Sequence, residues 1–149
     1  MSDAALADFV GAKVALVCGD KILVYLRDDK PGLPWAAKWD LPGGGREGEE
    51  SPETCALREL EEEFGLVLTA ARLIWGQRFP SMISPERLAW FFAGHITPED
   101  IAAIRFGTEG QTWEMMPIAA YLAHPAGIPD MQHRASLAIA NLALIPQGA

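Results

Sequence analysis

The 149-residue sequence lacks most features that define membrane-spanning, disulfide-rich or zinc-finger proteins. No apolar run approaches the roughly 20 residues that a membrane-spanning helix requires. The two cysteines, Cys18 and Cys55, are too few for a disulfide framework or a cysteine-based zinc site. Residues 1–4 carry neither the positive charge nor the apolar core of a secretory signal. These absences predict a cytoplasmic protein that makes no membrane contact.

Positive charge is also scarce, since 12 lysines and arginines stand against 20 aspartates and glutamates, for a net charge of −8. A protein that binds a nucleic-acid polymer would show a basic face, so such a partner is not expected. The acidic excess is local. Residues 44–66 hold eight glutamates and two arginines, a net of −6, which leaves 12 acidic and 10 basic residues, a net of −2, elsewhere. The charge balance does not exclude a small polyanionic substrate, provided that metal ions mediate its contact with the protein.

Strand and helix signals are mixed along the chain and predict one α/β domain over residues 1–149. Apolar, partly β-branched runs predict strands at 12–18, 21–26, 67–79, 87–96 and 112–116. Helices are predicted at 52–64, 117–123 and 129–144, with a short helix or turn from residue 97 and a loop over 27–38. This order predicts a central mixed sheet with helices on both faces.

The clearest helix signal lies between Ser51 and Gly65. Ser51 is the expected N-cap, Pro52 occupies the first turn, and Gly65 ends the helix. At about 100° per residue, the apolar side chains of this helix gather on one side, at Ala56, Leu57, Leu60 and Phe64. That side should face the core.

Three glutamates, Glu59, Glu62 and Glu63, fall together on another side of this helix. A solvated acidic face is the commonest explanation of such a run. However, two like charges about 6 Å apart repel by about 3 kcal/mol at an effective dielectric near 20, and the C-terminal end of a helix disfavours anions. The cluster therefore favours a functional role, and its hard oxygen ligands predict Mg²⁺ or Mn²⁺.

The segment from Gly44 to Leu66 resembles the signature of the Nudix hydrolases, G-x5-E-x7-R-E-U-x-E-E-x-G-U, in which U is apolar. Every fixed position is matched, by Gly44, Glu50, Arg58, Glu59, Leu60, Glu62, Glu63, Gly65 and Leu66. The resemblance implies a Nudix-type α/β/α sandwich that hydrolyses a nucleoside diphosphate linked to another group. One departure is Glu49, which stands where many relatives have glycine.

The resemblance also assigns metal ligands. Glu59, Glu62 and Glu63 match the glutamates that bind divalent metal in the family, and Glu50 matches a further carboxylate that tunes or binds it. Gly44 matches a position that offers its backbone carbonyl near the metal. The implied cofactor is Mg²⁺ or Mn²⁺.

Catalytic roles follow from the same resemblance. Arg58 matches an arginine that orients the glutamates. The base that deprotonates the attacking water lies either within the signature, where Glu62 and Glu63 are candidates, or at Glu109 in a later loop. The triplet Glu109-Gly110-Gln111 resembles a loop of the MutT-type nucleoside triphosphate pyrophosphohydrolases, although an exposed loop glutamate is an equally ordinary explanation.

The MutT resemblance favours hydrolysis of a nucleoside triphosphate to monophosphate and pyrophosphate, with 8-oxo-dGTP as one candidate substrate. Arg27 and Arg87 resemble basic residues near the nucleotide, and Asp130 resembles a base-reading position whose carboxylate would accept hydrogen bonds from guanine. Each also has a plain explanation, as a surface arginine or a first-turn aspartate. Among the aromatic residues, most of the set Trp35, Trp39, Phe79, Trp90 and Trp113 are expected in the core, and one of them could stack on a base.

Two other functions stay open. One is hydrolysis of ADP-ribose or another nucleoside diphosphate derivative, and the other is a non-catalytic Nudix ligand sensor. The complete signature disfavours the sensor. In each case the expected partner is a small nucleotide, and the protein is expected to be a monomer or a homodimer.

Overall fold

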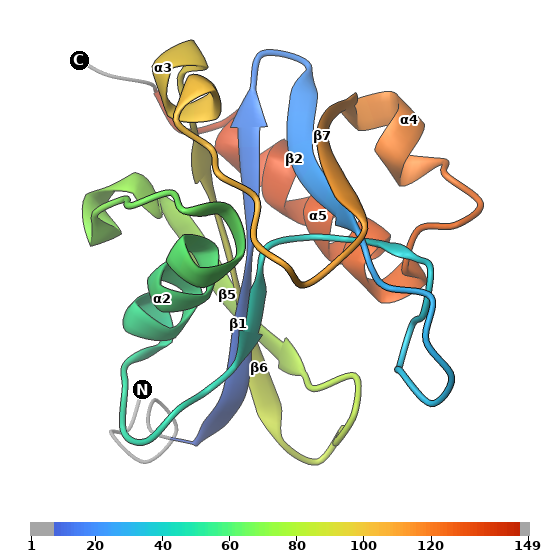
Figure 1. Ribbon diagram of the computed structural model, residues 1–149. Coiled ribbons are helices and arrows are strands. Elements are labelled where there is room, and N and C mark those ends of the chain that lie inside the picture. Colours follow the sequence, from blue (N-terminus) through green and yellow to red (C-terminus); the bar gives the residue numbers. More distant parts are fainter. Residues whose placement is uncertain (1–7, 147–149) are drawn as a thin grey trace.

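A seven-stranded mixed sheet forms the centre of the structure, a computed structural model in which residues 8–146 are described (Figure 1). Its strands are β1 (Phe9–Cys18), β2 (Lys21–Leu26), β3 (Trp39–Asp40), β4 (Gly43–Gly45), β5 (Trp75–Pro80), β6 (Leu88–His95) and β7 (Thr112–Pro117). The main order is β3-β2-β1-β6-β5, with β4 paired to β1 and β7 paired to β2. β1 and β6 run parallel, and the other strand pairs run antiparallel.

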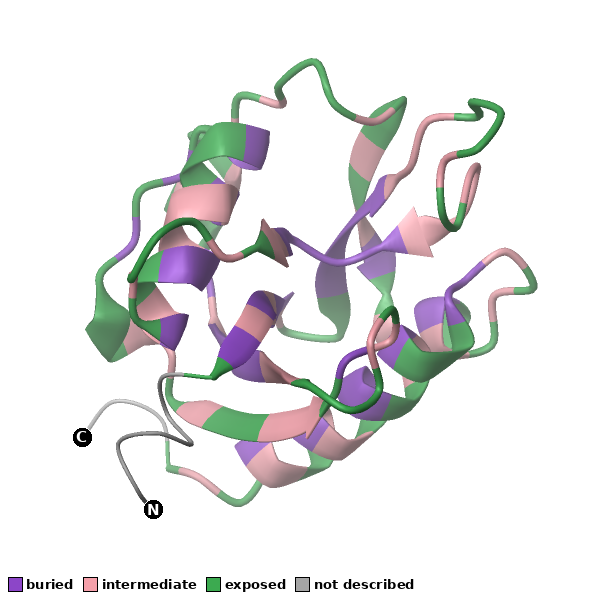
Figure 2. Cartoon of the chain, turned by 90° about the horizontal axis from the view of Figure 1, so that it is seen from below, coloured by how far each residue is buried: buried purple, intermediate pink, exposed green. Residues whose placement is uncertain are grey.

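Helices cover both faces of this sheet, as predicted (Figures 1 and 2). They are α2 (Pro52–Phe64), the 3₁₀ turn η1 (Ala70–Arg72), α3 (Pro98–Ala102), α4 (Ile118–Leu122) and α5 (Pro129–Leu142). α2 packs on β1 and β4, whereas α5 packs mainly on β5 and β6. Within residues 8–146 no helix is long and apolar enough to cross a membrane.

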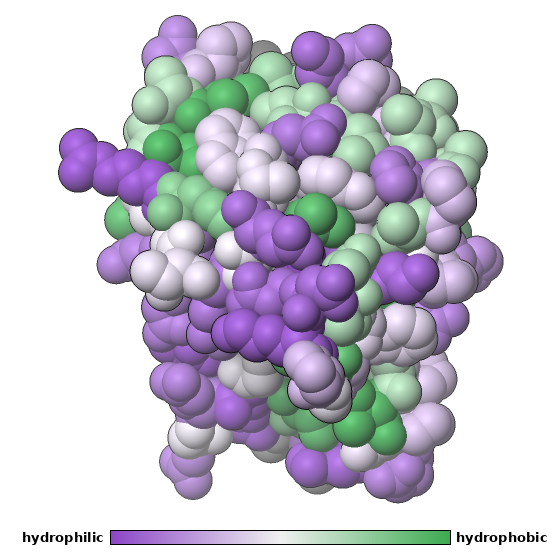
Figure 3. Space-filling view, turned by 45° about the vertical axis from the view of Figure 1, so that its right-hand side comes forward, coloured by the Kyte–Doolittle hydropathy of each residue, from purple (hydrophilic) through white to green (hydrophobic). Residues whose placement is uncertain are grey.

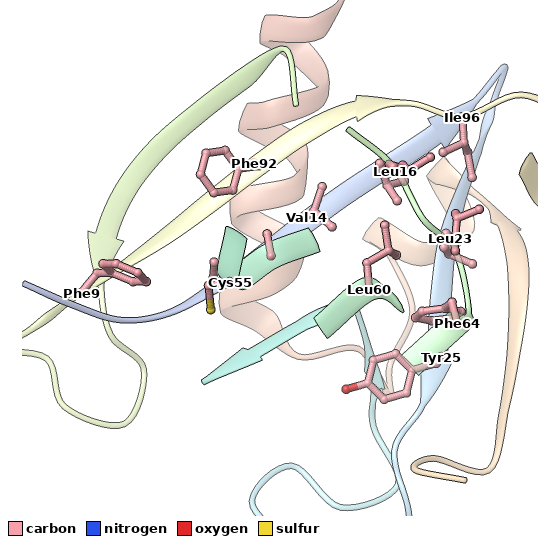
Figure 4. Packing of buried hydrophobic residues seen from close by; sticks show 14 residues of the cluster. Phe9, Val14, Leu16, Leu23, Tyr25, Cys55, Leu60, Phe64, Phe92 and Ile96 are labelled. Atoms are coloured by element: carbon pink, nitrogen blue, oxygen red, sulfur yellow. The ribbon is translucent and has the colours of Figure 1, made fainter. Parts of the chain in front are cut away.

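The core is divided in two by the sheet, because successive side chains of β1 point to opposite faces. Val14 and Leu16 join Leu60 and Phe64 of α2 in one cluster (Figure 4). Ala15 and Val17 join α5 residues in the other. On the α2 side, the rings of Phe64 and Tyr25 meet edge to face with their centroids 6.0 Å apart. The two clusters fix the helices on either side of β1.

The limits of α2 agree with the sequence prediction. The Ser51 hydroxyl accepts a hydrogen bond from the backbone N–H of Thr54 at 3.2 Å, and Pro52 begins the helix. Gly65 adopts the left-handed conformation at φ 63°, and its N–H donates to the carbonyl of Glu61. Of the four apolar positions, Ala56, Leu60 and Phe64 are fully buried, while Leu57 packs at the edge of the cluster.

Some predicted limits were wrong. The expected strand at 67–79 begins only at Trp75, because residues 70–72 form a 3₁₀ turn whose Arg72 donates to the backbone carbonyl of His95. The predicted last helix ends two residues early, at Leu142. β4 was not predicted as a strand, since three glycines carry no side-chain pattern. It forms because Gly44 and Gly45 lie opposite Ala12 and Gly11 of β1.

Candidate active site

The glycine strand β4 brings the backbone close to the acidic side of α2. A Cβ atom at Gly44 would lie 2.7 Å from Oε2 of Glu59, so the Gly44 backbone packs directly against that carboxylate. Gly43 has φ +135°, and a Cβ there would lie 2.1 Å from the carbonyl oxygen of Ala12. The two glycines are therefore required for different reasons: one for contact with Glu59, the other for pairing with β1.

Arg58 is the hub of the acidic cluster. Its guanidinium donates to both carboxylate oxygens of Glu50, at 2.7 and 2.9 Å, and to Oε1 of Glu59 at 3.0 Å. It also donates to Glu62 at 3.1 Å and to the carbonyl of Gly45 at 2.9 Å. The hydrogen bonds from Arg58 hold the pKa of Glu50 down at about 2. Because a two-point contact fixes direction as well as distance, Arg58 orients Glu50 and relieves repulsion among the glutamates.

Glu63 has a different environment from the other glutamates of α2. It is 7 % exposed, and its Oε1 accepts a hydrogen bond from the N–H of Gly43 at 2.8 Å. Burial raises the pKa of Glu63 to about 8, although the nearby charge of Lys13 opposes the shift. A buried carboxylate of this kind is stabilised by a cation.

A buried polar network lies beside Glu63. Nζ of Lys13 donates to Asp40 at 3.0 Å and to the carbonyl oxygens of Leu41 and Gly43, both at 3.1 Å. Arg27 donates to the same aspartate at 3.2 Å. Burial disfavours the charged lysine, but Asp40, Tyr25 and Glu63 together outweigh this effect, and the pKa of Lys13 is raised. This network fixes Arg27. Sequence reasoning missed this network, and the local signal for it was Lys13, a charged residue within the apolar strand β1.

One pocket of about 410 Å³ brings several predicted site residues together. Glu59 and Glu63 line it with the β4 glycines, including Gly44, and Arg27 and Glu109 lie on its wall. Glu109 belongs to a loop that is tied to the end of β2, because Gln111 donates to the carbonyl of Arg27 at 2.9 Å. The face shown in Figure 3 carries hydrophilic side chains interleaved with small apolar patches rather than a continuous apolar surface.

Other predicted site residues lie away from this wall. Glu50 and Arg58 form an ion pair and do not line the pocket. The Glu62 side chain is 55 % exposed, pairs with Arg58 and does not line the pocket either. Arg87 forms an ion pair with Asp8 at 3.0 Å. Asp130 is an exposed residue of the first turn of α5.

The described residues include oxygen donors that suit a hard cation, but these donors do not point toward one common position. Between residues 8 and 146 no group of three or more histidine, cysteine, aspartate or glutamate side chains is arranged to hold a metal. Arg58 engages Glu59 and Glu62, while Glu63 bonds to the Gly43 backbone. The donors on the pocket wall are carboxylates beside backbone carbonyls, which suit Mg²⁺ or Mn²⁺. Cys55 does not contribute a thiolate, because burial raises its pKa to about 12.

Solved structures with the same fold cover nearly the whole chain. The NUDIX domain of Shewanella oneidensis NrtR complexed with ADP ribose matches with a TM-score of 0.66 at 18% identity, covering 95% of this chain and 94% of that one. A bifunctional NMN adenylyltransferase/ADP ribose pyrophosphatase from Francisella tularensis, complexed with AMP and a Mn ion, matches with a TM-score of 0.69 at 17% identity over 90% of this chain and 42% of that one. At these identities the likeness concerns the fold.

Sequence relatives are more informative about the family. An RNA pyrophosphohydrolase from Acidiphilium cryptum is 41% identical over 90 residues, 58% of this chain and 51% of that protein. An 8-oxo-dGTP diphosphatase from Haemophilus influenzae is 35% identical over 88 residues, 59% of this chain and 61% of that protein. The matches thus span between half and two thirds of these curated relatives. The model of the NUDIX domain family matches residues 9–135, which is most of the sequence, and the chain therefore belongs to the NUDIX family.

Proposed function

We propose that this protein hydrolyses a pyrophosphate bond of a nucleoside triphosphate, such as 8-oxo-dGTP, and releases monophosphate and pyrophosphate. The observation that carries the proposal is the single pocket shared by Glu59, Glu63, Arg27 and Glu109. Its volume of about 410 Å³ lies within the roughly 300–1,000 Å³ typical of small-molecule sites. The pocket combines carboxylates for a cation with a basic group for phosphate oxygens, as a polyanionic substrate requires.

In this proposal Glu59, Glu62, Glu63 and the carbonyl of Gly44 hold a divalent cation, which when bound neutralises phosphate oxygens and makes water more acidic. NUDIX proteins generally use divalent metal ions, and Mn is present in the Francisella tularensis structure. Arg58 positions Glu59 through its hydrogen bond. The residues on the pocket wall then act on the substrate directly.

Arg27 and Glu109 are those residues. Arg27 is held by Asp40 and by the carbonyl of Pro34, which leaves its guanidinium on the pocket wall where it can donate to phosphate oxygens. Glu109 is the proposed acceptor of the proton from the attacking water. Glu62 and Glu63 remain the alternative bases.

The products test the proposed function. With Mg²⁺ or Mn²⁺ present, we expect each turnover of dGTP or 8-oxo-dGTP to yield one monophosphate and one pyrophosphate, because the loop that carries Glu109 resembles that of the MutT-type pyrophosphohydrolases and lies on the pocket wall. Chromatography of the nucleotides together with a pyrophosphate assay measures both products. Release of orthophosphate with a nucleoside diphosphate would contradict the proposed bond cleavage.

Replacing Glu109 by Gln tests the base. We expect at least a tenfold fall in kcat with little change in metal affinity, since a positioned base contributes about 10²–10⁴ in rate and solvent can replace part of that at an exposed position. The measurement is kcat across a metal titration. Glu99→Gln is the matched control, because Glu99 is an exposed glutamate of α3 outside the pocket. An unchanged kcat for Glu109→Gln would place the base among the glutamates of α2.

Two other substrate classes deserve the same assay. The Francisella tularensis protein is named an ADP ribose pyrophosphatase, the NrtR domain is complexed with ADP ribose, and the Acidiphilium cryptum relative is named an RNA pyrophosphohydrolase. The net charge of −8 disfavours an RNA polymer, since backbone phosphates need basic partners. Hydrolysis of ADP-ribose, or of a 5′-triphosphorylated oligonucleotide, at a hundredfold higher kcat/KM than any free triphosphate would replace the present proposal.

We also propose a cytoplasmic location and a monomeric or homodimeric state. Both cysteines are free, with Cys55 buried and Cys18 partly buried, which agrees with a reducing compartment.

A further inference from the structure

The pocket has a second end, formed by α5. Glu59 and Glu63 of α2 line one part of the pocket wall, and Met131 and Arg134 of α5 line another. α2 and α5 lie on opposite faces of the sheet (Figure 1), and their buried residues belong to different core clusters. A ligand whose phosphates lie at the glutamates can therefore extend toward α5.

Arg134 is a buried cation at this second end that forms no ion pair within residues 8–146, although the nearby charge of Asp130 partly offsets the effect of burial on its pKa. It is 8 % exposed, and within the described residues its guanidinium makes one hydrogen bond, from Nη2 to the carbonyl of Pro80 at 2.7 Å. The guanidinium also stacks over the ring of Phe79, 4.8 Å from the centroid. Asp130, one turn earlier on α5, is exposed and forms no ion pair with it within residues 8–146. Burial lowers the pKa of Arg134.

This environment leaves hydrogen-bonding capacity unused. A guanidinium has five N–H donors in a planar fork and no acceptor, so it selects a ligand group with adjacent acceptors. Within the described residues the indole Nε1 of Trp90, another residue of the pocket lining, is also buried without a hydrogen-bond partner, but Trp90 packs with the α2-side cluster and not beside Arg134. Buried donors are rarely left unpaired in a complete site. The chemistry missing at this end is a pair of acceptor atoms.

The surrounding wall suits a flat aromatic ring. Met82, Ile83 and Met131 contribute apolar side chains, and Trp35 adds an indole that is 39 % exposed. Trp35 also adopts the left-handed conformation at φ 58°, which is unfavourable for a bulky residue and recurs at binding sites. An apolar wall around a charged fork is the arrangement expected for a nucleobase read at its edge.

We infer that Arg134 determines base specificity by donating to the O6 and N7 acceptors of guanine. Among the bases, guanine presents two adjacent acceptors on this edge, whereas adenine places an amino donor beside N7. The inference rests on the proposed function, since it assumes that the pocket takes a nucleotide. It also has a consequence for oxidised guanine: 8-oxoguanine carries a hydrogen on N7, a donor that opposes the guanidinium, so the two-point contact applies to dGTP and Arg134 could donate only to a single carbonyl oxygen of 8-oxo-dGTP.

The experiment compares dGTP with 7-deaza-dGTP, in which the N7 acceptor is replaced by C–H. For the wild type we expect kcat/KM to be at least about tenfold higher with dGTP, mainly through KM, because a two-point arginine contact discriminates by that factor or more. In Arg134→Met the ratio should fall to within about twofold of one. Arg134→Lys keeps the charge without the fork and should lose most of the preference.

Controls separate this inference from the proposed function. His133→Ala alters an exposed neighbour on α5 and should keep the wild-type ratio. Calorimetric binding of dGMP and 7-deaza-dGMP tests the same contact without turnover and also reports whether the variants are folded. A protein that cleaves no triphosphate yet binds dGMP tenfold more tightly than 7-deaza-dGMP would reject the proposed function and support the inference. A wild-type ratio near one, or an unchanged ratio in folded Arg134 variants, would overturn the inference, as expected if that arginine contacts phosphate instead.

Discussion

Removal of divalent cations with EDTA should abolish hydrolysis, and Mg²⁺ or Mn²⁺ should restore it. The physical reason is the charge of the pocket, where the carboxylates of Glu59 and Glu63 would meet a polyanionic substrate with no cation between them. The same removal should lower the melting temperature, since an ion at 100 times its Kd stabilises the folded state by about 2.7 kcal/mol. Paired rate assays and melting curves, with metal and with EDTA, measure both effects.

Two variants of α2 sharpen this test. Glu63→Gln should lose activity and most of the stabilisation by metal, because it replaces a buried carboxylate of the pocket wall. Glu61→Gln removes the same charge from an exposed position outside the pocket and should respond to metal like the wild type. Full activity after exhaustive dialysis against EDTA would show that the glutamates do not act through a cation.

Gly44→Ala should lower kcat/KM at least about hundredfold, since a displacement near 1 Å in a catalytic group can cost that factor. The added Cβ would lie 2.7 Å from Oε2 of Glu59, too close for any ordinary contact, and the carboxylate must move away. Gly44 does not have a positive φ, so alanine is compatible with its backbone. The loss should therefore come from a displaced ligand and appear as weaker metal activation in a Mg²⁺ titration.

The neighbouring residue provides the control. Among the described residues an added Cβ at Gly45 meets only the carbonyl oxygen of Val10, at 3.9 Å, so Gly45→Ala inserts the same methyl group into the same strand without touching Glu59. Gly45 also lies on the pocket wall and its carbonyl accepts a hydrogen bond from Arg58, but alanine keeps that carbonyl, so we expect the loss of kcat/KM in Gly45→Ala to be at least about tenfold smaller than in Gly44→Ala. Equal losses in both variants would mean that β4 tolerates no side chain, rather than that Glu59 is displaced.

Local signals explain why α2 could be predicted from the sequence in detail. Its N-cap at Ser51, its first-turn Pro52 and its left-handed Gly65 all act within one or two helical turns. The extra strand β4 escaped prediction, because its conformation depends on β1, a partner about 30 residues earlier in the chain. The same holds for residues 67–74, where an apolar composition typical of a strand gives way to a turn held by Arg72.

In the candidate site, too, the features set by local spacing could be predicted, and those set by tertiary contacts could not. The helical spacing placed Glu59 and Glu63 near one another, but it could not distinguish a buried Glu63 from an exposed Glu62, since that depends on how β4 crosses the helix. The pairing of Lys13 with Asp40 and the position of Arg134 join segments far apart in the chain. Side chains that act through tertiary contacts leave no periodic pattern in the sequence.

Because Arg58 already contacts the glutamates, a cation that binds them replaces existing ionic interactions with new ones. Before any ion arrives, its guanidinium already neutralises Glu50 and holds Glu59 and Glu62. An ion that recruits Glu59 or Glu62 must share that ligand with the arginine, so part of its electrostatic gain replaces an interaction that is lost. When no ion is bound, Arg58 therefore reduces the repulsion among the glutamate side chains of the site. Occupancy would follow the free concentration of cation around the protein, and the rate of hydrolysis would vary with magnesium supply.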